Sequence, residues 1–250
     1  MHYYLIKFFF KLFIFISLFS TSFAKERPTE FTWKNVKYDV TKTWDKAYVY
    51  IPGKISKTRV VKFSSHSKYP VVILMHGCSG IKGAVERWSL YLKSLGFAVI
   101  VPNSFAIPKR KSNCDATKKT SGLGVPVHLL RDLEAVYALK QVSKLDWTDK
   151  NNIFLMGHSE GGIAASLAVD NILKGIIITG YHCYGGVPDT EIPILAINFE
   201  KDPWIKWKGS CQKNWGNRKK SKQIILEGTG HDSSRSVIAK REVYNFLKNF

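Results

Sequence analysis

The sequence predicts a single α/β domain with a mostly parallel central sheet and helices on both of its faces. Three observations lead to that prediction. Short continuous apolar runs such as PVVILMHG (70–77) are typical of strands buried on both faces. These runs alternate with helical patterns from residue 70 to the C-terminus, as in sheets built from strand–helix–strand units. Finally, 250 residues with 45% hydrophobic content suffice for one full core, and no repeat or linker marks a second domain.

Each expected element follows from a local pattern, taken in chain order. After a polar stretch, AYVYIP (47–52) and RVVKFS (59–64) are predicted strands separated by a Pro-Gly turn. An amphipathic pattern that ends at a glycine predicts a helix over 84–96, and apolar residues at helical spacing predict another over 126–145. The other predicted strands are 70–77, 97–103, 152–156, 175–180, 193–199 and 223–228, and the other predicted helices are 161–170 and 237–250.

The first 24 residues have the composition of a secretory signal peptide. Two lysines accompany the apolar run LFIFISLF (12–19), and Ser22 and Ala24 occupy the small-residue positions of a signal-peptidase site. The run is short for a membrane span. We therefore expect cleavage after Ala24, export to the periplasm or the medium, and a mature domain of residues 25–250. An uncleaved anchor and a buried helix are the alternatives.

Export makes the four cysteines candidates for disulfides, and spacing alone does not choose among their three possible pairings. The net charge is +19, or +17 without the first 24 residues, which carry two lysines and no acidic residue. Such a charge attracts anionic surfaces. No helix-turn-helix, zinc-finger or RNA-binding motif is present, so nucleic acid is not an expected partner. We favour a basic surface on an exported protein over dedicated binding of a polyanion.

The segment GHSEGG (157–162) lies between a predicted strand and a predicted helix. In the pattern G-x-S-x-G, the glycines permit a sharp, strained turn that lifts the serine hydroxyl clear of the sheet. The pattern is common by chance and also fits an ordinary tight turn. Its position between strand and helix favours Ser159 as a catalytic nucleophile.

A serine nucleophile needs a base to take its proton and an acid to orient that base. In sheets of this type the chain order is serine, acid, histidine. Asp202 and His231 follow the last two predicted strands, which is where the acid and the base belong. Asp202 is preferred to Glu200 because it lies farther beyond the strand end. Asp232 is expected to cap the closing helix.

An oxyanion that forms on a substrate carbonyl needs backbone N–H donors. One expected donor is the amide of Glu160, at the start of the helix after the nucleophile. The other is the amide of Cys78, in the loop HGCSG (76–80) that follows an earlier strand. For His76 and His158 we favour a structural role, in which they hold their turns by packing and hydrogen bonds.

The motifs HGCSG, GHSEGG, EKDPW and GTGHD together resemble the α/β-hydrolase superfamily, and within it the dienelactone hydrolase-like proteins, over roughly residues 45–250. The namesake enzymes carry a cysteine as nucleophile, whereas this chain has Ser159. The resemblance therefore implies the α/β-hydrolase fold and a general serine ester hydrolase. We expect no metal or organic cofactor, because the sequence has no H-E-x-x-H motif, paired C-x-x-C or phosphate loop. The strand order of the superfamily also places loops together in pairs, which implies the disulfides Cys78–Cys114 and Cys183–Cys211. Free buried cysteines are the alternative.

Two features bear on the substrate, which we expect to be a small ester. Superfamily members usually carry a cap domain between the strands near 180 and 193, but here only residues 181–192 link them, so we expect no cap domain. The loop 203–222 carries tryptophans among lysines. Trp204 and Trp207, with Tyr181, are the expected substrate rim, suited to an aromatic or anionic ester. A solvated loop above packed tryptophans is equally supported.

The main hypothesis is an exported, monomeric enzyme that cleaves carboxylic esters through an acyl-enzyme intermediate and is not inserted in a membrane. The rival is a non-catalytic basic protein that binds anionic surface polymers on the same scaffold. Peptidases, thioesterases and acyltransferases use the same catalytic parts, and the sequence does not separate them from esterases.

Overall fold

The structure is a computed structural model that describes residues 27–108, 110, 112, 114–120, 126–205, 210–215 and 218–250. The expected signal peptide and Trp207 lie outside the described residues. Among the helices of the described residues, none combines the length and the apolar character that a membrane span requires.

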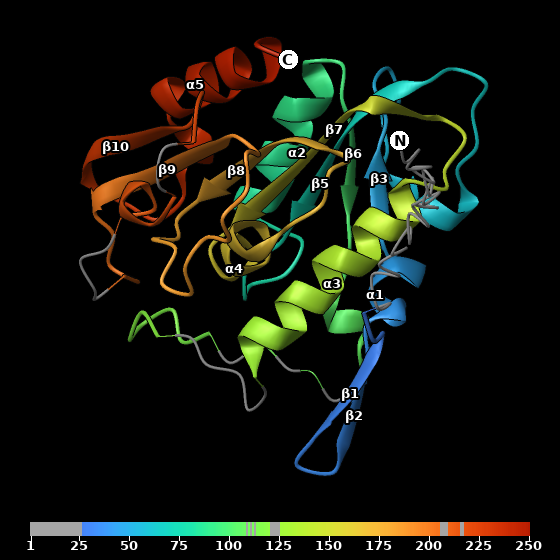
Figure 1. The fold of residues 1–250 in the computed structure, drawn as a ribbon, viewed down its shortest axis with the longest axis horizontal. Helices are drawn as coiled ribbons and strands as arrows, with labels where there is room; N and C mark the ends of the chain where they lie inside the picture. The colour runs from blue at the N-terminus through green and yellow to red at the C-terminus, as the bar shows by residue number, and fades with distance from the viewer. Residues whose placement is uncertain are drawn as a thin grey trace, which may run out of the picture.

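An eight-stranded sheet forms the centre of the molecule, in the order β10-β9-β8-β7-β5-β6-β3-β4 (Figure 1). Its strands are β3 (Tyr48–Tyr50), β4 (Thr58–Arg59), β5 (Tyr69–Met75), β6 (Ala98–Val101), β7 (Thr148–His158), β8 (Leu173–Thr179), β9 (Ile194–Lys201) and β10 (Lys222–Thr229). All neighbouring pairs from β10 to β6 are parallel, whereas β3 pairs antiparallel with both β6 and β4. The prediction of a mostly parallel sheet is therefore confirmed.

Helices pack on both faces of this sheet, as predicted (Figure 1). Helices α2 (Ala84–Ser94) and α5 (Val237–Lys248) cover one face. The other face is covered by α3 (Val127–Val142) and α4 (Glu160–Leu167), with the short α1 (Thr41–Asp45) beside them. Alternate side chains of β5 enter the two cores, which explains why that strand reads as one continuous apolar run.

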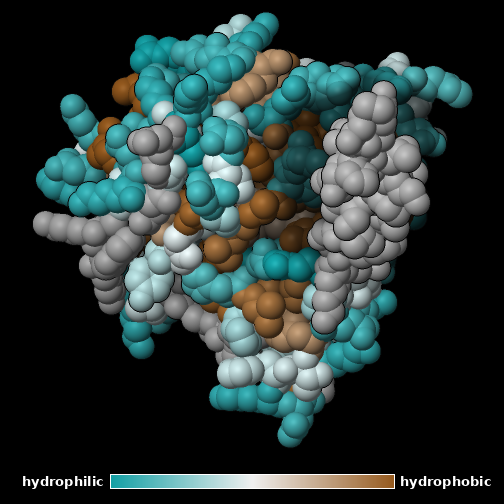
Figure 2. All heavy atoms as spheres, viewed as in Figure 1, coloured by the Kyte–Doolittle hydropathy of each residue, from teal (hydrophilic) through white to brown (hydrophobic). Residues whose placement is uncertain are grey.

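The face of the molecule that is seen in Figure 1 carries both polar and apolar residues. Figure 2, in the same view as Figure 1, shows hydrophilic residues around the border of this face and apolar residues gathered at its centre. A polar border is expected for a chain with net charge +19.

The N-terminal part departs from the prediction in two places. RVVKFS forms only the two residues of β4 and then a 3-10 turn over Val60–Lys62. This turn buries Val60 and leaves Val61 60% exposed. A longer strand would need packing on both of its faces, and the side on which Val61 lies has none. The polar stretch before β3 also contains a hairpin of β1 (Glu30–Trp33) and β2 (Val36–Asp39), in addition to α1.

The connection between β8 and β9 carries no inserted domain. β8 ends at Thr179 and β9 begins at Ile194, with a turn and loop in between. The expectation that no cap domain is inserted between β8 and β9 is confirmed.

Two disulfides join loops at that edge. Cys78 is bonded to Cys114 and Cys183 to Cys211, with Cα–Cα distances of 5.9 and 4.9 Å. These are the same two pairs that the resemblance implied.

Removal of the Cys183–Cys211 bridge is expected to destabilise the fold substantially. The bridge closes a loop with a sequence separation of 28 residues. In the chain-entropy model, a bridge that closes a loop of this length stabilises the folded state by about 3.6 kcal/mol, because it restricts the unfolded chain. The double variant Cys183→Ala/Cys211→Ala should lose roughly that free energy of unfolding in urea denaturation. An unchanged denaturation midpoint, with the same slope, would contradict this prediction.

Candidate active site

Ser159 occupies a strained turn between β7 and α4. Its φ is +55° and its ψ is −121°, a region that residues with a side chain rarely adopt. The neighbouring glycines make the turn possible. A Cβ atom on Gly161 would overlap the carbonyl of Met75 in β5, and one on Gly157 would overlap the carbonyl of Gly161. The GHSEGG segment thus has glycine at the two places where the backbone leaves no room for a side chain.

Ser159, His231 and Asp202 lie in hydrogen-bonded contact. The Nε2 atom of His231 is 2.8 Å from the Ser159 Oγ, and its Nδ1 atom is 2.7 Å from the Asp202 Oδ2. Because a carboxylate only accepts, Nδ1 carries the proton in the neutral ring and Nε2 is free to accept the serine proton. The Asp202 side chain is 1% exposed and that of His231 is 15% exposed. The arrangement can therefore move a proton from the serine hydroxyl to the imidazole.

Asp202 is held in place by its own loop. Its Oδ1 accepts a hydrogen bond of 2.9 Å from the amide of Trp204. Glu200, the alternative acid, is exposed on β9. The structure thus places Asp202 beside the histidine.

The expectation that Asp232 caps the closing helix is wrong. A 3-10 turn (Ser233–Arg235) separates it from α5, and Asp232 caps that turn by accepting from the Ser234 amide at 3.0 Å. Ser236 caps α5 instead, accepting from the amide of Ala239. Asp232 is also ion-paired with Arg87. Burial acts to raise the pKa of Asp232, but hydrogen bonds from Ser234 and Arg87 outweigh burial and hold the pKa below its ordinary value.

The two expected oxyanion donors lie on segments beside the nucleophile. A Cβ atom on Gly77 would be 3.0 Å from the Cβ of Ser159, so the loop 76–80 packs directly against the serine. Cys78 and Ser159 line the same pocket. Glu160 is the first residue of α4, where backbone N–H groups have no partner within the helix. Both amides thus belong to segments beside Ser159, where an N–H group can donate to an anionic oxygen. Their role as oxyanion donors stays a prediction.

His76 and His158 are buried side chains that hold the turns around the site. His76 Nδ1 donates to the Gly77 carbonyl at 2.7 Å, and its Nε2 accepts from the Ser104 amide at 2.9 Å. His158 Nδ1 lies 3.1 Å from the Thr179 Oγ1. Burial, assisted by the charge of Arg131, lowers the pKa of His76 well below its ordinary value. Burial, followed by the nearby His231, lowers the pKa of His158 to about 3.

These two histidines should make the fold sensitive to acid. In the unfolded chain a histidine takes up a proton near its ordinary pKa of about 6.5, whereas buried His158 stays neutral down to about pH 3. Below about pH 6.5 the unfolded state therefore binds more protons than the folded state. The free energy of unfolding has its full value above about pH 6.5 and decreases as the pH falls toward 3. We expect His158→Asn to reduce the slope of unfolding free energy against pH by about 1.4 kcal/mol per unit near pH 5. Urea denaturation of both proteins at several pH values measures the slope, and identical slopes would contradict the prediction.

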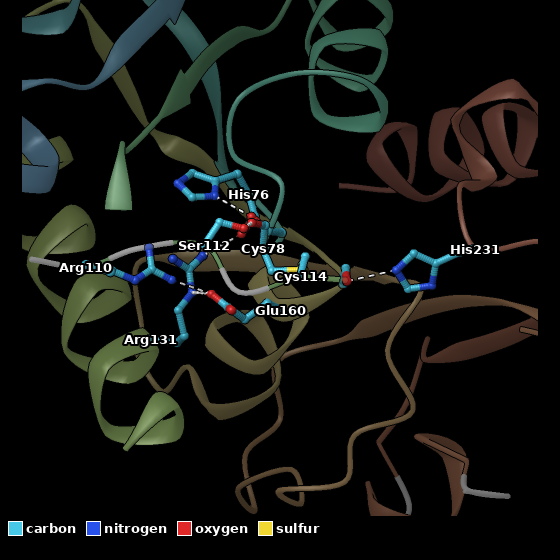
Figure 3. The surroundings of a disulfide bond; sticks show 10 residues. His76, Cys78, Arg110, Ser112, Cys114, Arg131, Glu160 and His231 are labelled. Carbon is cyan, nitrogen blue, oxygen red and sulfur yellow. Dashed lines mark hydrogen bonds and ion pairs between the residues drawn. A yellow bond between two sulfur atoms is a disulfide. The ribbon is translucent and has the colours of Figure 1, made fainter. Parts of the chain in front are cut away.

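A buried cluster of charges beneath the nucleophile was not anticipated from the sequence. Arg110 Nη2 lies 2.5 Å from the Glu160 Oε1, and Arg131 Nη1 lies 2.5 Å from the Glu134 Oε2. All four side chains are at most 7% exposed. Figure 3 shows Arg110 and Arg131 pointing toward Glu160. The sequence held one sign of this cluster. Arg131 and Glu134 are three residues apart among the apolar residues of α3, a spacing that lets an arginine and a glutamate pair.

A pocket of about 370 Å³ opens in front of the serine. Its walls are formed by the loop after β5, the start of α2, and the loops that carry the acid and the histidine. The lining residues are Gly77, Cys78, Ser79, Gly80, Lys82, Gly83, Ala84, Val85, Arg87, His158, Ser159, Trp204, His231 and Asp232. The Trp204 ring lies 5.5 Å from the His231 ring, and Lys119 Nζ lies 5.5 Å from the Trp204 ring centroid. Trp204 therefore lines the pocket beside His231, and its place in a substrate rim stays a prediction.

Tyr181 does not lie at the rim. The residue is 8% exposed and belongs to the core on the α3 and α4 face. Its hydroxyl accepts from the Gly185 amide at 3.0 Å. The ring also fills the space beside Gly162, where a Cβ atom would come within 2.5 Å of the Tyr181 Cβ. The rim assignment of Tyr181 is therefore wrong, because the residue packs α4 onto the sheet.

Sequence comparisons give partial likenesses, and no family model matches the chain. A probable dipeptidyl peptidase 4 of Emericella nidulans is 29% identical over 109 residues, which are 41% of this chain and 14% of that protein. The dipeptidyl peptidase 4 of Trichophyton rubrum is 25% identical over 115 residues, or 43% of this chain and 14% of that protein. The matched region thus spans only about 14% of the length of these curated relatives.

Solved structures match most of the chain. Est1E from Butyrivibrio proteoclasticus has a TM-score of 0.55 at 14% identity and covers 88% of this chain and 97% of its own. The same protein with ferulic acid bound has a TM-score of 0.58, at 14% identity, and covers 89% and 98%. An alpha-beta serine hydrolase homologue from Coxiella burnetii has a TM-score of 0.52 at 16% identity and covers 88% and 95%. With this sheet order and these structural likenesses, the chain has the α/β-hydrolase fold.

Proposed function

We propose that this protein is a serine hydrolase that cleaves small carboxylic esters through a covalent acyl-enzyme. The single observation that carries the proposal is the hydrogen-bonded series from the Ser159 Oγ through His231 to Asp202, at the wall of an open pocket. A serine hydroxyl needs such a base and acid to become a nucleophile. Four motifs support a dienelactone hydrolase-like enzyme in which serine replaces the usual cysteine.

The proposed reaction has two halves. In the first, the Ser159 Oγ attacks the ester carbonyl while its proton moves to the His231 Nε2, and the amides of Cys78 and Glu160 stabilise the oxyanion. The imidazolium, stabilised by Asp202, then gives its proton to the leaving alcohol, which leaves the acyl group on the serine. In the second half, His231 takes a proton from water as the water oxygen attacks the acyl carbonyl. The bond from the acyl carbon to the Ser159 Oγ then breaks, His231 returns its proton to that oxygen, and the acid is released.

The pocket supports a substrate with an aromatic or anionic acyl group. Trp204 offers a flat apolar surface next to His231, and Lys82 and Lys119 place positive charge at the same opening. The structural likeness to a protein that binds ferulic acid supports the same substrate class. The partial likeness to dipeptidyl peptidases makes peptides the competing substrate.

A fluorophosphonate probe tests the catalytic proposal directly. The probe should label the purified protein at Ser159, as the serine oxygen bonds to phosphorus and fluoride leaves. Esters of p-nitrophenol with acetyl, longer aliphatic and cinnamoyl-type acyl groups should then be hydrolysed faster than matched thioesters and dipeptide amides. Folded protein that neither takes the label nor hydrolyses any ester would overturn the proposal and favour the non-catalytic basic binding protein. Faster cleavage of peptides would reassign the substrate class.

Trp204→Ala should raise the KM for aromatic acyl esters by about tenfold, because the ring loses its flat apolar contact. The KM for the acetyl ester should change less than about threefold, since that group is too small to reach the ring. Steady-state kinetics on both esters measure the difference. Equal increases in KM for both esters would show that the aromatic acyl group binds away from Trp204.

We also propose that the protein is exported and that its N-terminal segment is removed. The two disulfides support an oxidising compartment, since such bonds are rare where thiols are kept reduced. Mass spectrometry of the mature protein should find Lys25 at the N-terminus. An intact Met1 would overturn the cleavage proposal.

A further inference from the structure

Both proposed oxyanion donors are tied to residues of one segment, the connection between β6 and α3. Cys78 is bonded to Cys114 of this connection through a disulfide. Glu160 is ion-paired with Arg110 of the same connection, at 2.5 Å. Cys78 follows β5 and Glu160 follows β7, so a single segment contacts both sides of the oxyanion site.

Further bonds hold the loop that contains Cys78. Ser112 Oγ donates to the Cys78 carbonyl at 2.5 Å. On the other side, Arg131 Nη2 donates to the His76 carbonyl at 2.8 Å. Figure 3 shows the disulfide between this cluster of charges and His231. Backbone groups on both sides of the Cys78 amide are thus anchored, which fixes the direction of that N–H.

The ion pair of Arg110 and Glu160 is poorly explained by stability alone. The Arg110 side chain is 1% exposed and the Glu160 side chain 7% exposed. The cost of removing two charges from water is about as large as their attraction, so a buried pair of this kind adds little net stability. Its geometric effect is larger, because Glu160 is joined to Ser159 by one peptide bond and starts α4. Fixing the Glu160 side chain therefore fixes the orientation of the peptide whose N–H is the proposed oxyanion donor.

We propose that Arg110 and the Cys78–Cys114 disulfide are positioning elements that together set the two amides of the oxyanion hole. This inference rests on the proposed ester hydrolase activity. Neither element touches the substrate, and each acts through the residue that it holds. Both donors need placement within a few tenths of an ångström of the developing oxyanion, so a small rotation of either segment weakens transition-state binding more than substrate binding.

The first test is Arg110→Met, which removes the charge and keeps most of the side-chain volume. Loss of one oxyanion donor outright costs about 100- to 1,000-fold in kcat, so its misplacement should cost roughly 10- to 100-fold. The KM should change less than about threefold, and the acidic limb of the pH profile should not move, because His231 and Asp202 are untouched. Arg110→Lys should recover part of the rate, since it keeps a positive charge beside Glu160.

A second readout separates positioning from general damage to the fold. An ester and its thionoester differ in one atom, and sulfur is the weaker hydrogen-bond acceptor. An intact oxyanion hole therefore favours the oxygen ester, and this preference should shrink several-fold in Arg110→Met. Arg218→Met is the matched control, because Arg218 is also buried and instead donates to the carbonyls of Pro188 and Ile192. It should leave the preference unchanged.

The disulfide is tested by Cys114→Ala and by reduction of the wild-type protein. Tris(2-carboxyethyl)phosphine converts each disulfide to two thiols and becomes the phosphine oxide, taking its oxygen from water. Both treatments should lower kcat and the oxygen-over-sulfur preference, as in Arg110→Met. Cys183→Ala/Cys211→Ala, which keeps the Cys78–Cys114 bridge, should retain the oxygen-over-sulfur preference before reduction and lose it afterwards.

The outcomes are distinguishable. A wild-type protein without fluorophosphonate labelling or ester hydrolysis overturns the proposed function itself. An active wild type whose Arg110→Met and Cys114→Ala variants keep kcat and the oxygen-over-sulfur preference overturns only this inference. If neither variant folds, reduction of the folded wild type decides, with circular dichroism as the check on folding. An unchanged preference in the reduced, folded protein refutes the role of the disulfide, and with it the paired mechanism.

Discussion

Ser159→Ala should lower kcat for ester hydrolysis by roughly 10⁵- to 10⁶-fold, the largest effect expected of any substitution in this chain. The hydroxyl oxygen is the atom that forms the acyl bond, and it lies 2.8 Å from the Nε2 atom of His231 that activates it. A small residual rate above that of water is expected, since the oxyanion donors and the pocket remain. Alanine is the appropriate substitute because glycine would also relax the φ of +55° and thus alter stability.

The measurement is the initial rate of hydrolysis of a p-nitrophenyl ester, together with fluorophosphonate labelling. In Ser159→Ala the labelling should vanish and the hydrolysis rate should fall to the small residual value, while circular dichroism and the denaturation midpoint stay close to wild type. Ser94→Ala serves as the matched control, because Ser94 is exposed on α2 and its hydroxyl donates to the Tyr91 carbonyl. It should leave activity unchanged. Retention of more than about one per cent of the rate in Ser159→Ala would assign the chemistry to another residue.

The sequence was sufficient to predict the parallel part of the central sheet and the positions of the three site residues at its edge. Apolar runs mark strands that are buried on both faces, and every parallel strand presents the residue after it at one edge of the sheet. That rule brings Ser159, Asp202 and His231 together from three separate loops. Each of them follows a strand that could be recognised from its own residues alone.

What could not be predicted depends on contacts between distant segments. The pairing of Arg110 with Glu160 joins residues 50 apart, and neither residue lies in a pattern that marks it as buried. The local sequence does not show that Tyr181 enters the core, where it fills the space beside Gly162 instead of lying at the pocket rim. Asp232 was assigned to the wrong cap because a 3-10 turn of three residues has no periodicity to detect.

Asp202→Asn should lower kcat by about 10⁴-fold with little change in KM. The Asp202 Oδ2 accepts the Nδ1 proton of His231 at 2.7 Å, which leaves Nε2 facing the serine without a proton. An asparagine amide in that position would donate to Nδ1 instead, which moves the ring proton to Nε2. The histidine would then face the serine as a donor, and it could no longer accept the proton of the nucleophile. The variant keeps the volume of the side chain, so the fold should be retained.

Glu200→Gln is the matched control for this substitution, because it makes the same chemical change two residues away on an exposed position of β9. It should retain activity within about twofold of wild type, whereas Asp202→Asn should be recovered only in part at high pH, where hydroxide replaces the missing base. If Glu200→Gln lost more activity than Asp202→Asn, the acid of the site would be Glu200, and the end of β9 would have to turn in solution to bring it to His231. Asp202 is buried, with its side chain 1% exposed, and it accepts a hydrogen bond from the Trp204 amide. This position argues against such a turn, because the Asp202 carboxylate would lose its contacts with both His231 and the Trp204 amide.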